Sequence, residues 1–297
     1  MVPKVEFEVS RAVNEFCHLS VLYSEIMPVE LANGILRNAS YQERYHRLHD
    51  HGTRLKLQKT GPFTSAPEWY EFVTGLMERD KTGGLSSFSK HSGFAELFQG
   101  LRQRRALGFD EIWKETRPRL VKYMYSFQSL WTPISDRVLS KLRELAKAHW
   151  QTGTIRAHYV DCLYGGFAWK DSIGLTTLPD MDVQKKFLAH ELSELITPQQ
   201  LVRQHLQKEG LDLRIADTVV DLFAYFSVRD FLSKHDSKSE GKNGIRPSRR
   251  YYAEADVLYM FFERYAEDPM IYADFDSVIR DMISVLYQKN ALPVLTD

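Results

Sequence analysis

The chain has 297 residues, 43% of them hydrophobic, which is enough for one large domain or two ordinary ones. Its 39 basic and 39 acidic residues balance, so no excess positive charge favours nucleic acid as a partner. The sequence begins without a basic, apolar leader and contains no run of about 18 or more apolar residues. We therefore expect a soluble, cytoplasmic protein with no nucleic-acid or membrane partner. Cys17 and Cys162 are too far apart in sequence to indicate a disulfide framework.

Residues 1–134 are predicted to form a helical N-terminal region. Apolar residues recur there at helical spacing, in one group near Val13 and Phe16 and in another near Phe109 and Trp113. Segments rich in Gly, Ser, Thr and Pro, such as residues 60–67 and 81–87, interrupt these runs and are typical of loops.

Residues 135–297 are predicted to form a second region that contains helices and a small sheet. Residues 136–150 form an amphipathic helix whose apolar face carries Val138, Leu139, Leu142, Leu145 and Ala146. Two strand candidates follow, residues 154–163 and 167–178, separated by a Gly-Gly turn. The sequence therefore indicates an α+β protein that is mainly helical.

The segment from Phe187 to Ile196 carries the most informative motif, His190-Glu191-Leu-Ser-Glu194. It lies on a helix that residues 179–182 can cap, and the i, i+4 spacing places His190 and Glu194 on one face. The leucines of the segment lie on nearly the opposite side. Glu191 points to one side of the pair, where a glutamate can take a proton from a metal-bound water without being a ligand.

A second helix, residues 213–228, supplies further acidic residues. Most of its circumference is apolar, which predicts that it is largely buried. Asp217 and Asp221 share one face, and carboxylates in a buried helix need a cation, a metal or several hydrogen-bond donors nearby.

This order of helix, two strands, His-Glu-x-x helix and acidic helix resembles the gluzincin metallopeptidases, in their compact minigluzincin form. The resemblance covers roughly residues 135–233. It implies a metal held by His190, Glu194 and Asp217, with Asp221 orienting His190 and Glu191 as the catalytic proton shuttle. It also implies that the segment Ile173–Thr177 is an edge strand that pairs with an extended peptide or protein substrate.

The chain departs from the family pattern at two ligand positions. Glu194 replaces the second histidine of His-Glu-x-x-His, and Asp217 replaces a glutamate. The family implies zinc, whereas a His/Glu/Asp set also suits Mn or Fe(II). Two functions stay open: a metal-dependent peptidase or related hydrolase, and a catalytically inactive relative that has lost its metal and binds a protein or peptide segment.

Three further groups are candidates for the site. Tyr251 and Tyr252 stand where related enzymes bring in a group that stabilises the oxyanion. The polar run of residues 234–244 is a candidate lid. The cluster His46-Arg-Leu-His49-Asp50-His51 is a weaker candidate for metal binding than for a polar helix end. Motifs for phosphate-binding loops, dinucleotide binding and serine nucleophile elbows do not occur in the sequence.

Overall fold

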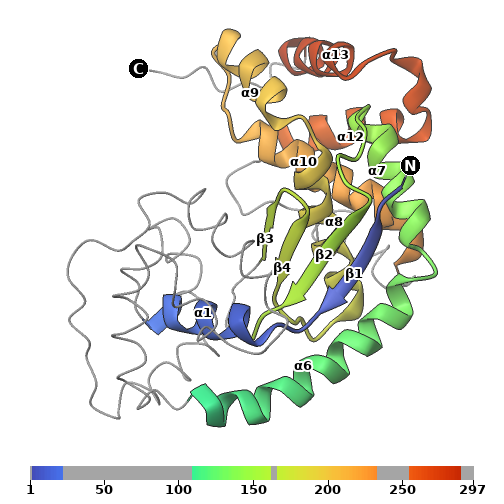
Figure 1. Cartoon of the computed structure of the whole chain (residues 1–297). Coiled ribbons are helices and arrows are strands. Elements are labelled where there is room, and N and C mark those ends of the chain that lie inside the picture. The colour runs from blue at the N-terminus through green and yellow to red at the C-terminus, as the bar shows by residue number, and fades with distance from the viewer. Residues whose placement is uncertain (1, 23–108, 162–165, 233–253, 289–297) are drawn as a thin grey trace. The chain divides into compact units, whose positions relative to one another are not determined.

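A computed structural model describes residues 2–22, 109–161, 166–232 and 254–288 (Figure 1). Contacts along the backbone divide the chain into two compact units. One comprises Val5–Ser129 and Ile155–Thr177, and contains most of the sheet. The other comprises Met1–Lys4, Leu130–Thr154 and Leu178–Asp297, and is helical. Residues 155–177 thus belong to the same unit as Val5–Ser129. The predicted domain boundary at residue 134 stays a prediction.

The first unit is built on a mixed four-stranded sheet with the order β1-β2-β4-β3. Its strands are β1 (Lys4–Glu8), β2 (Thr154–Tyr159), β3 (Gly166–Trp169) and β4 (Ser172–Leu175). Strand β4 pairs parallel with β2 on one side and antiparallel with β3 on the other. A tight connection at Lys170, whose φ is 56°, joins β3 to β4. The predicted strand over residues 167–178 is therefore two strands joined by a turn.

The prediction of an edge strand at Ile173–Thr177 is wrong for the part that forms β4. Ile173 lies opposite Ala157 of β2 and Ala168 of β3, so both sides of the backbone are already paired. A peptide cannot add to a strand whose hydrogen-bonding groups are satisfied on both sides. In the described sheet the outer strands are β1 and β3.

Two helices belong to the same unit, α1 (Arg11–Leu22) and α6 (Phe109–Trp131). Asn14 of α1 is buried and joins the helix to the end of β2: its side-chain amide donates to the Tyr159 carbonyl and accepts from the Asp161 amide. Tyr159 also stacks on Phe7 of β1 and meets Phe127 of α6 edge to face. This aromatic group forms the core between β1, β2 and α6.

The helical unit is arranged around α10 (Ile215–Val228) (Figure 1). α10 packs against α7 (Ser135–Ala146), α8 (Met181–Ile196), α9 (Gln199–Lys208) and α12 (Glu254–Glu267). The 3-10 turns η3 (Arg229–Phe231) and η4 (Pro269–Ile271) and the helix α13 (Phe275–Gln288) complete the unit. Phe223 of α10 lies at its centre, in contact with the rings of Phe262, Tyr265 and Phe275.

Several local predictions are confirmed. The predicted helix from residue 136 is α7, and all five positions of its apolar face are buried. Asp180 caps α8 by accepting hydrogen bonds from the backbone N–H groups of Asp182 and Val183. The fold class is α+β and mainly helical, as predicted. Strand β1 was not predicted, although its alternating sequence Lys4-Val-Glu-Phe-Glu8 is typical of a strand.

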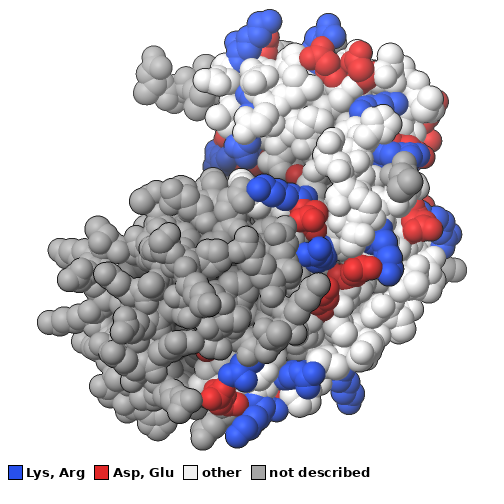
Figure 2. Space-filling view, viewed as in Figure 1, with Lys and Arg blue, Asp and Glu red and all other residues white. Residues whose placement is uncertain are grey.

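The described surface carries charges of both signs. Figure 2 shows basic and acidic side chains interspersed on the face in view, as the balanced composition leads one to expect. Among the described helices, none combines the length and the apolar character that crossing a membrane requires. Cys17 is a buried free thiol, and burial raises its pKa.

The close approach of Phe167 to Gly174 generates a stability prediction. The two residues are opposite each other in the β3–β4 pair, and a Cβ atom added at Gly174 would lie 2.1 Å from Phe167 Cε1. Because Phe167 is buried, its ring must shift, and we expect Gly174→Ala to lower the free energy of unfolding by about 1–3 kcal/mol. Urea denaturation followed by circular dichroism measures this change.

Gly153→Ala is the matched control, because among the described residues, its chain neighbours aside, no atom lies within 4 Å of a Cβ at that position. Its effect should stay within about 0.5 kcal/mol of the wild type. Equal stability of the two variants would contradict the packing of Phe167 on Gly174.

Candidate functional site

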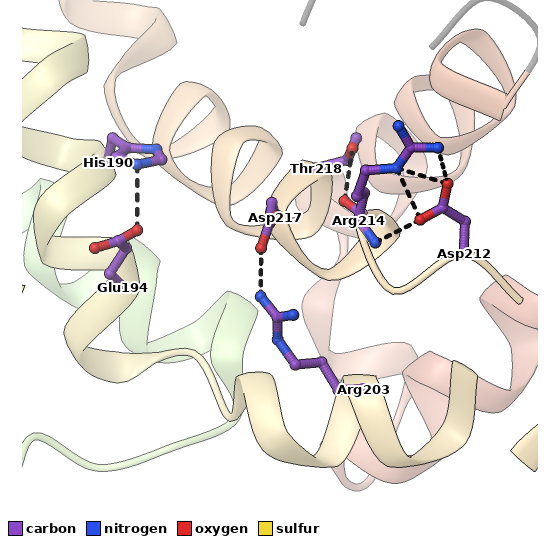
Figure 3. A network of polar contacts seen from close by, with 7 residues as sticks. All are labelled: His190, Glu194, Arg203, Asp212, Arg214, Asp217 and Thr218. Atoms are coloured by element: carbon purple, nitrogen blue, oxygen red, sulfur yellow. Dashed lines mark hydrogen bonds and ion pairs between the residues drawn. The ribbon is translucent and has the colours of Figure 1, made fainter. Parts of the chain in front are cut away.

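Helix α8 presents His190 and Glu194 on one face. Its N-terminus is fixed by the Asp180 cap, and Leu188 and Leu192 on the other side are fully buried. The side chains of His190 and Glu194 are 31% and 36% exposed, and His190 Nε2 lies 3.5 Å from Glu194 Oε1 (Figure 3). The predicted i, i+4 pair therefore forms, and solvent can reach it.

Asp221 of α10 holds the other nitrogen of the imidazole. Its Oδ1 lies 2.8 Å from His190 Nδ1, so Nδ1 donates a hydrogen bond to the carboxylate. This is the contact that the resemblance to gluzincins implies for Asp221. It fixes the orientation of the ring and leaves Nε2 directed at Glu194.

The Nε2 atom and the Glu194 carboxylate require a positive charge between them. With the Nδ1 hydrogen given to Asp221, a neutral imidazole would turn a lone pair toward the lone pairs of Glu194. Burial alone would lower the pKa of His190, but hydrogen bonds with Asp221 and Glu194 and the charges of Glu191 and Asp221 outweigh it and raise the pKa to about 11. In the metal-free protein a proton on Nε2 supplies the charge, and a metal ion at the same place would replace that proton.

Glu191 is buried next to this pair. Only 3% of it is exposed, and its Oε2 atom has no hydrogen-bond partner among the described residues. Burial and the charge of Glu194 raise the pKa of Glu191 to about 8, against the lowering effect of His190. A carboxyl group with a pKa near neutrality can both accept and donate a proton.

Asp217 lies in a different environment from the one predicted. Its side chain is 56% exposed, and its Oδ1 lies 2.6 Å from Nη2 of Arg203 on α9 (Figure 3). The expectation of a buried carboxylate at this position is therefore wrong. The pKa of Asp217 is raised, mainly by partial burial and in part by the charges of Asp221 and Glu194, while Arg203 and His190 lower it. Asp217 therefore remains within electrostatic range of the pair.

Arg203 is the residue that sequence reasoning missed. It lies in a short amphipathic helix in which basic side chains are unremarkable, and no local pattern links it to Asp217. The link arises because α9 packs on α10. Arg203 stands 14 residues before Asp217 in sequence, outside the range of any helical spacing rule.

The donor set fits a metal ion in part. Two ligands of a tetrahedral metal, each about 2.1 Å from it, lie about 3.4 Å apart, close to the 3.5 Å between His190 Nε2 and Glu194 Oε1. Within the described ranges, however, no group of three His, Cys, Asp or Glu side chains is arranged to hold a metal. The pair fits two positions of a coordination sphere, whereas Asp217, the third predicted ligand, is paired with Arg203 instead.

The remaining candidates lie outside the described residues. These are Tyr251, Tyr252, the run 234–244 and the cluster around His46, His49 and Asp50. Their proposed roles stay predictions. Comparison of the chain with protein-family models, with curated proteins and with solved structures found no match.

The buried carboxyl group of Glu191 generates a prediction of pH dependence. Its pKa is about 8 in the folded protein, against an ordinary value of 4.5. Between these values the folded state binds the proton and the unfolded state does not, so this group makes stability fall as pH rises from about 4.5 to about 8. Glu191→Gln removes the titration, and its free energy of unfolding should vary less across that window than that of the wild type.

Urea denaturation at several pH values between 4 and 9 checks this. In Glu194→Gln the pH dependence should be weaker than in the wild type but still present, because burial raises the pKa of Glu191 more than the charge of Glu194 does. A parallel pH profile for wild type and Glu191→Gln would show that Glu191 titrates normally.

Proposed function

We propose that this chain is a metal-dependent hydrolase of the peptidase type, with its metal held by His190 and Glu194. The observation that supports this most directly is the position of His190 between two carboxylates. Asp221 accepts from Nδ1 at 2.8 Å, and Glu194 stands 3.5 Å from Nε2. Proteins often orient a metal-binding histidine in this way. One carboxylate accepts a hydrogen bond from Nδ1, and Nε2 faces the metal and a second, metal-binding carboxylate.

Each residue has a defined task in the proposed reaction. A bound divalent metal would supply Lewis acidity toward the scissile carbonyl and lower the pKa of the attacking water. Glu191 accepts a proton from that water and returns it to the leaving amine, for which a pKa near 8 is suitable. Asp221 keeps the His190 ring in place, and the partial burial of the pair strengthens the electrostatic interactions there.

One contact favours a second function, a catalytically inactive relative that binds a protein or peptide segment. The ion pair between Arg203 and Asp217 neutralises the third ligand position without a metal. Protonated His190 lies between Asp221 and Glu194 and offsets one of these two negative charges. A site balanced like this can persist after catalysis is lost.

Metal binding is the first test. Calorimetric titration of the purified chain with Zn, Mn or Fe(II) should show one bound metal, and His190→Ala should abolish binding. Asp221→Asn keeps the shape of the side chain but weakens its hydrogen bond to Nδ1, and should lower the affinity about 10-fold to 100-fold.

His205→Ala is the matched control. His205 forms a similar contact with a carboxylate, 2.6 Å to Asp276, but it lies on α9 and faces α13. Its substitution should leave the affinity unchanged. If none of the three metals binds the wild type, the hydrolase proposal is wrong and the inactive relative is favoured.

Hydrolysis of a denatured protein substrate is the second test. The metal-loaded wild type should cleave it, and Glu191→Gln should lose activity by about 10²-fold to 10⁴-fold, as expected for removal of a general base. Metal affinity should be retained in this variant, because Glu191 is not a ligand in the proposal. Metal binding without cleavage by the wild type would instead support a binding role.

A further inference from the structure

We infer that a surface formed by α12, η4 and α13 docks a basic, amphipathic helix of a partner protein. We call it the α12–η4 surface. It combines exposed apolar side chains with exposed carboxylates, namely Met260, Met270 and Ile271 with Asp256, Glu267, Asp268, Asp274 and Asp281. None of these residues belongs to the His190 site, so the partner adds to the proposed function and does not depend on it.

The apolar part of the α12–η4 surface is strongly exposed. Met270 is 80% exposed, Ile271 65% and Met260 50%. Exposed apolar side chains are commonly scattered singly, whereas Met270 and Ile271 are consecutive in η4, which packs on α12. Methionine is flexible and polarisable, and protein interfaces are enriched in it. The surface can therefore adapt to the apolar side chains of a partner.

The turn η4 is held in shape by the protein itself. Pro269 is buried, and Asp268 accepts a hydrogen bond from the Met270 backbone N–H at 3.2 Å. Tyr272 donates a hydrogen bond to Asp281 of α13. Figure 1 shows this turn joining α12, in orange, to α13, in red. A preformed surface loses little conformational freedom on binding, which favours a docking role.

The same part of the chain is strongly acidic. Residues 254–288 contain eight Asp or Glu residues, two Arg and no Lys or His, although the whole chain has no net charge. Asp276 is already paired with His205 and Arg280. The carboxylates of the α12–η4 surface still outnumber the arginines, so the surface carries a negative potential.

Apolar side chains flanked by carboxylates define the chemistry of the partner. A basic amphipathic helix can place its apolar residues on Met270 and Ile271 while its Lys and Arg residues meet the carboxylates. An anionic membrane would be repelled by the same carboxylates. A second copy that presented the same face would bring like charges together. The basic helix is therefore the occupant that satisfies both parts of the surface.

The test is fluorescence anisotropy with a labelled peptide of about 18 residues, in which Leu recurs at i, i+3, i+4 and i+7 and Lys fills the other positions. The wild type should bind it with a Kd of about 1–100 μM, and binding should weaken as the salt concentration rises. Met270→Ser combined with Ile271→Ser should weaken binding about tenfold or more. Asp256→Asn combined with Glu267→Gln should weaken it about threefold and make it less sensitive to salt.

Leu213→Ser is the matched control. Leu213 is another exposed apolar residue of the helical unit, but it precedes α10 and lies outside the α12–η4 surface. Its substitution should leave the Kd within twofold of the wild type. The changed side chains are exposed, and thermal unfolding of each variant checks that it is folded. A peptide with Glu in place of Lys, and one with the same composition in scrambled order, should bind at least tenfold more weakly.

Each outcome has a defined meaning. Equal binding by the wild type and the Met270→Ser, Ile271→Ser variant overturns the assignment of the surface. No binding by the wild type, or equal binding of the Glu peptide, overturns the chemistry of the partner. Sedimentation velocity that shows a dimer of the wild type, lost in the same variant, would assign the surface to a second copy instead. None of these results bears on metal binding or hydrolysis at His190.

Discussion

The burial of α10 is the constraint on which the rest of the helical unit depends. The consecutive residues Leu222, Phe223 and Ala224 are all buried, although successive side chains of a helix point about 100° apart. A helix that is apolar around most of its circumference must be surrounded, and α7, α8, α9 and α12 all pack on it. The narrow face with Asp217 and Asp221 stays partly exposed, and these carboxylates pair with side chains of the neighbouring helices.

Those partners define the chemistry of the site. α8 brings His190 to Asp221, and α9 brings Arg203 to Asp217. Each carboxylate thus receives a positive or proton-donating group from a different helix. His190 and Arg203 thus offset the charges of Asp221 and Asp217 within the protein.

Glu191 differs from its neighbours because its Oε2 atom has no hydrogen-bond partner among the described residues. A buried carboxylate with an unbonded oxygen costs free energy, and protonation lowers that cost. Because burial disfavours the charged form, the pKa of Glu191 is raised. Burying this carboxyl group lowers the stability of the fold. Functional sites often contain such destabilising groups, which supports a functional role for Glu191.

Much of the local structure followed from the sequence. The apolar spacing of α7, the cap at Asp180, the burial of α10 and the shared face of His190 and Glu194 depend on helical periodicity and on neighbouring residues, which the sequence contains directly. The contact of Asp221 with His190 was expected only through a family resemblance, because no local rule joins residues on separate helices.

Tertiary structure decided what the sequence left open. The strand order placed β4 inside the sheet, since pairing between distant strands depends on the whole sheet and not on the alternation of one segment. The packing of α9 on α10 joined Arg203 to Asp217, since such a contact depends on how two helices are rotated against each other. The sequence by itself determined which side chains share a face of a helix, and the tertiary structure decided which charges those faces meet.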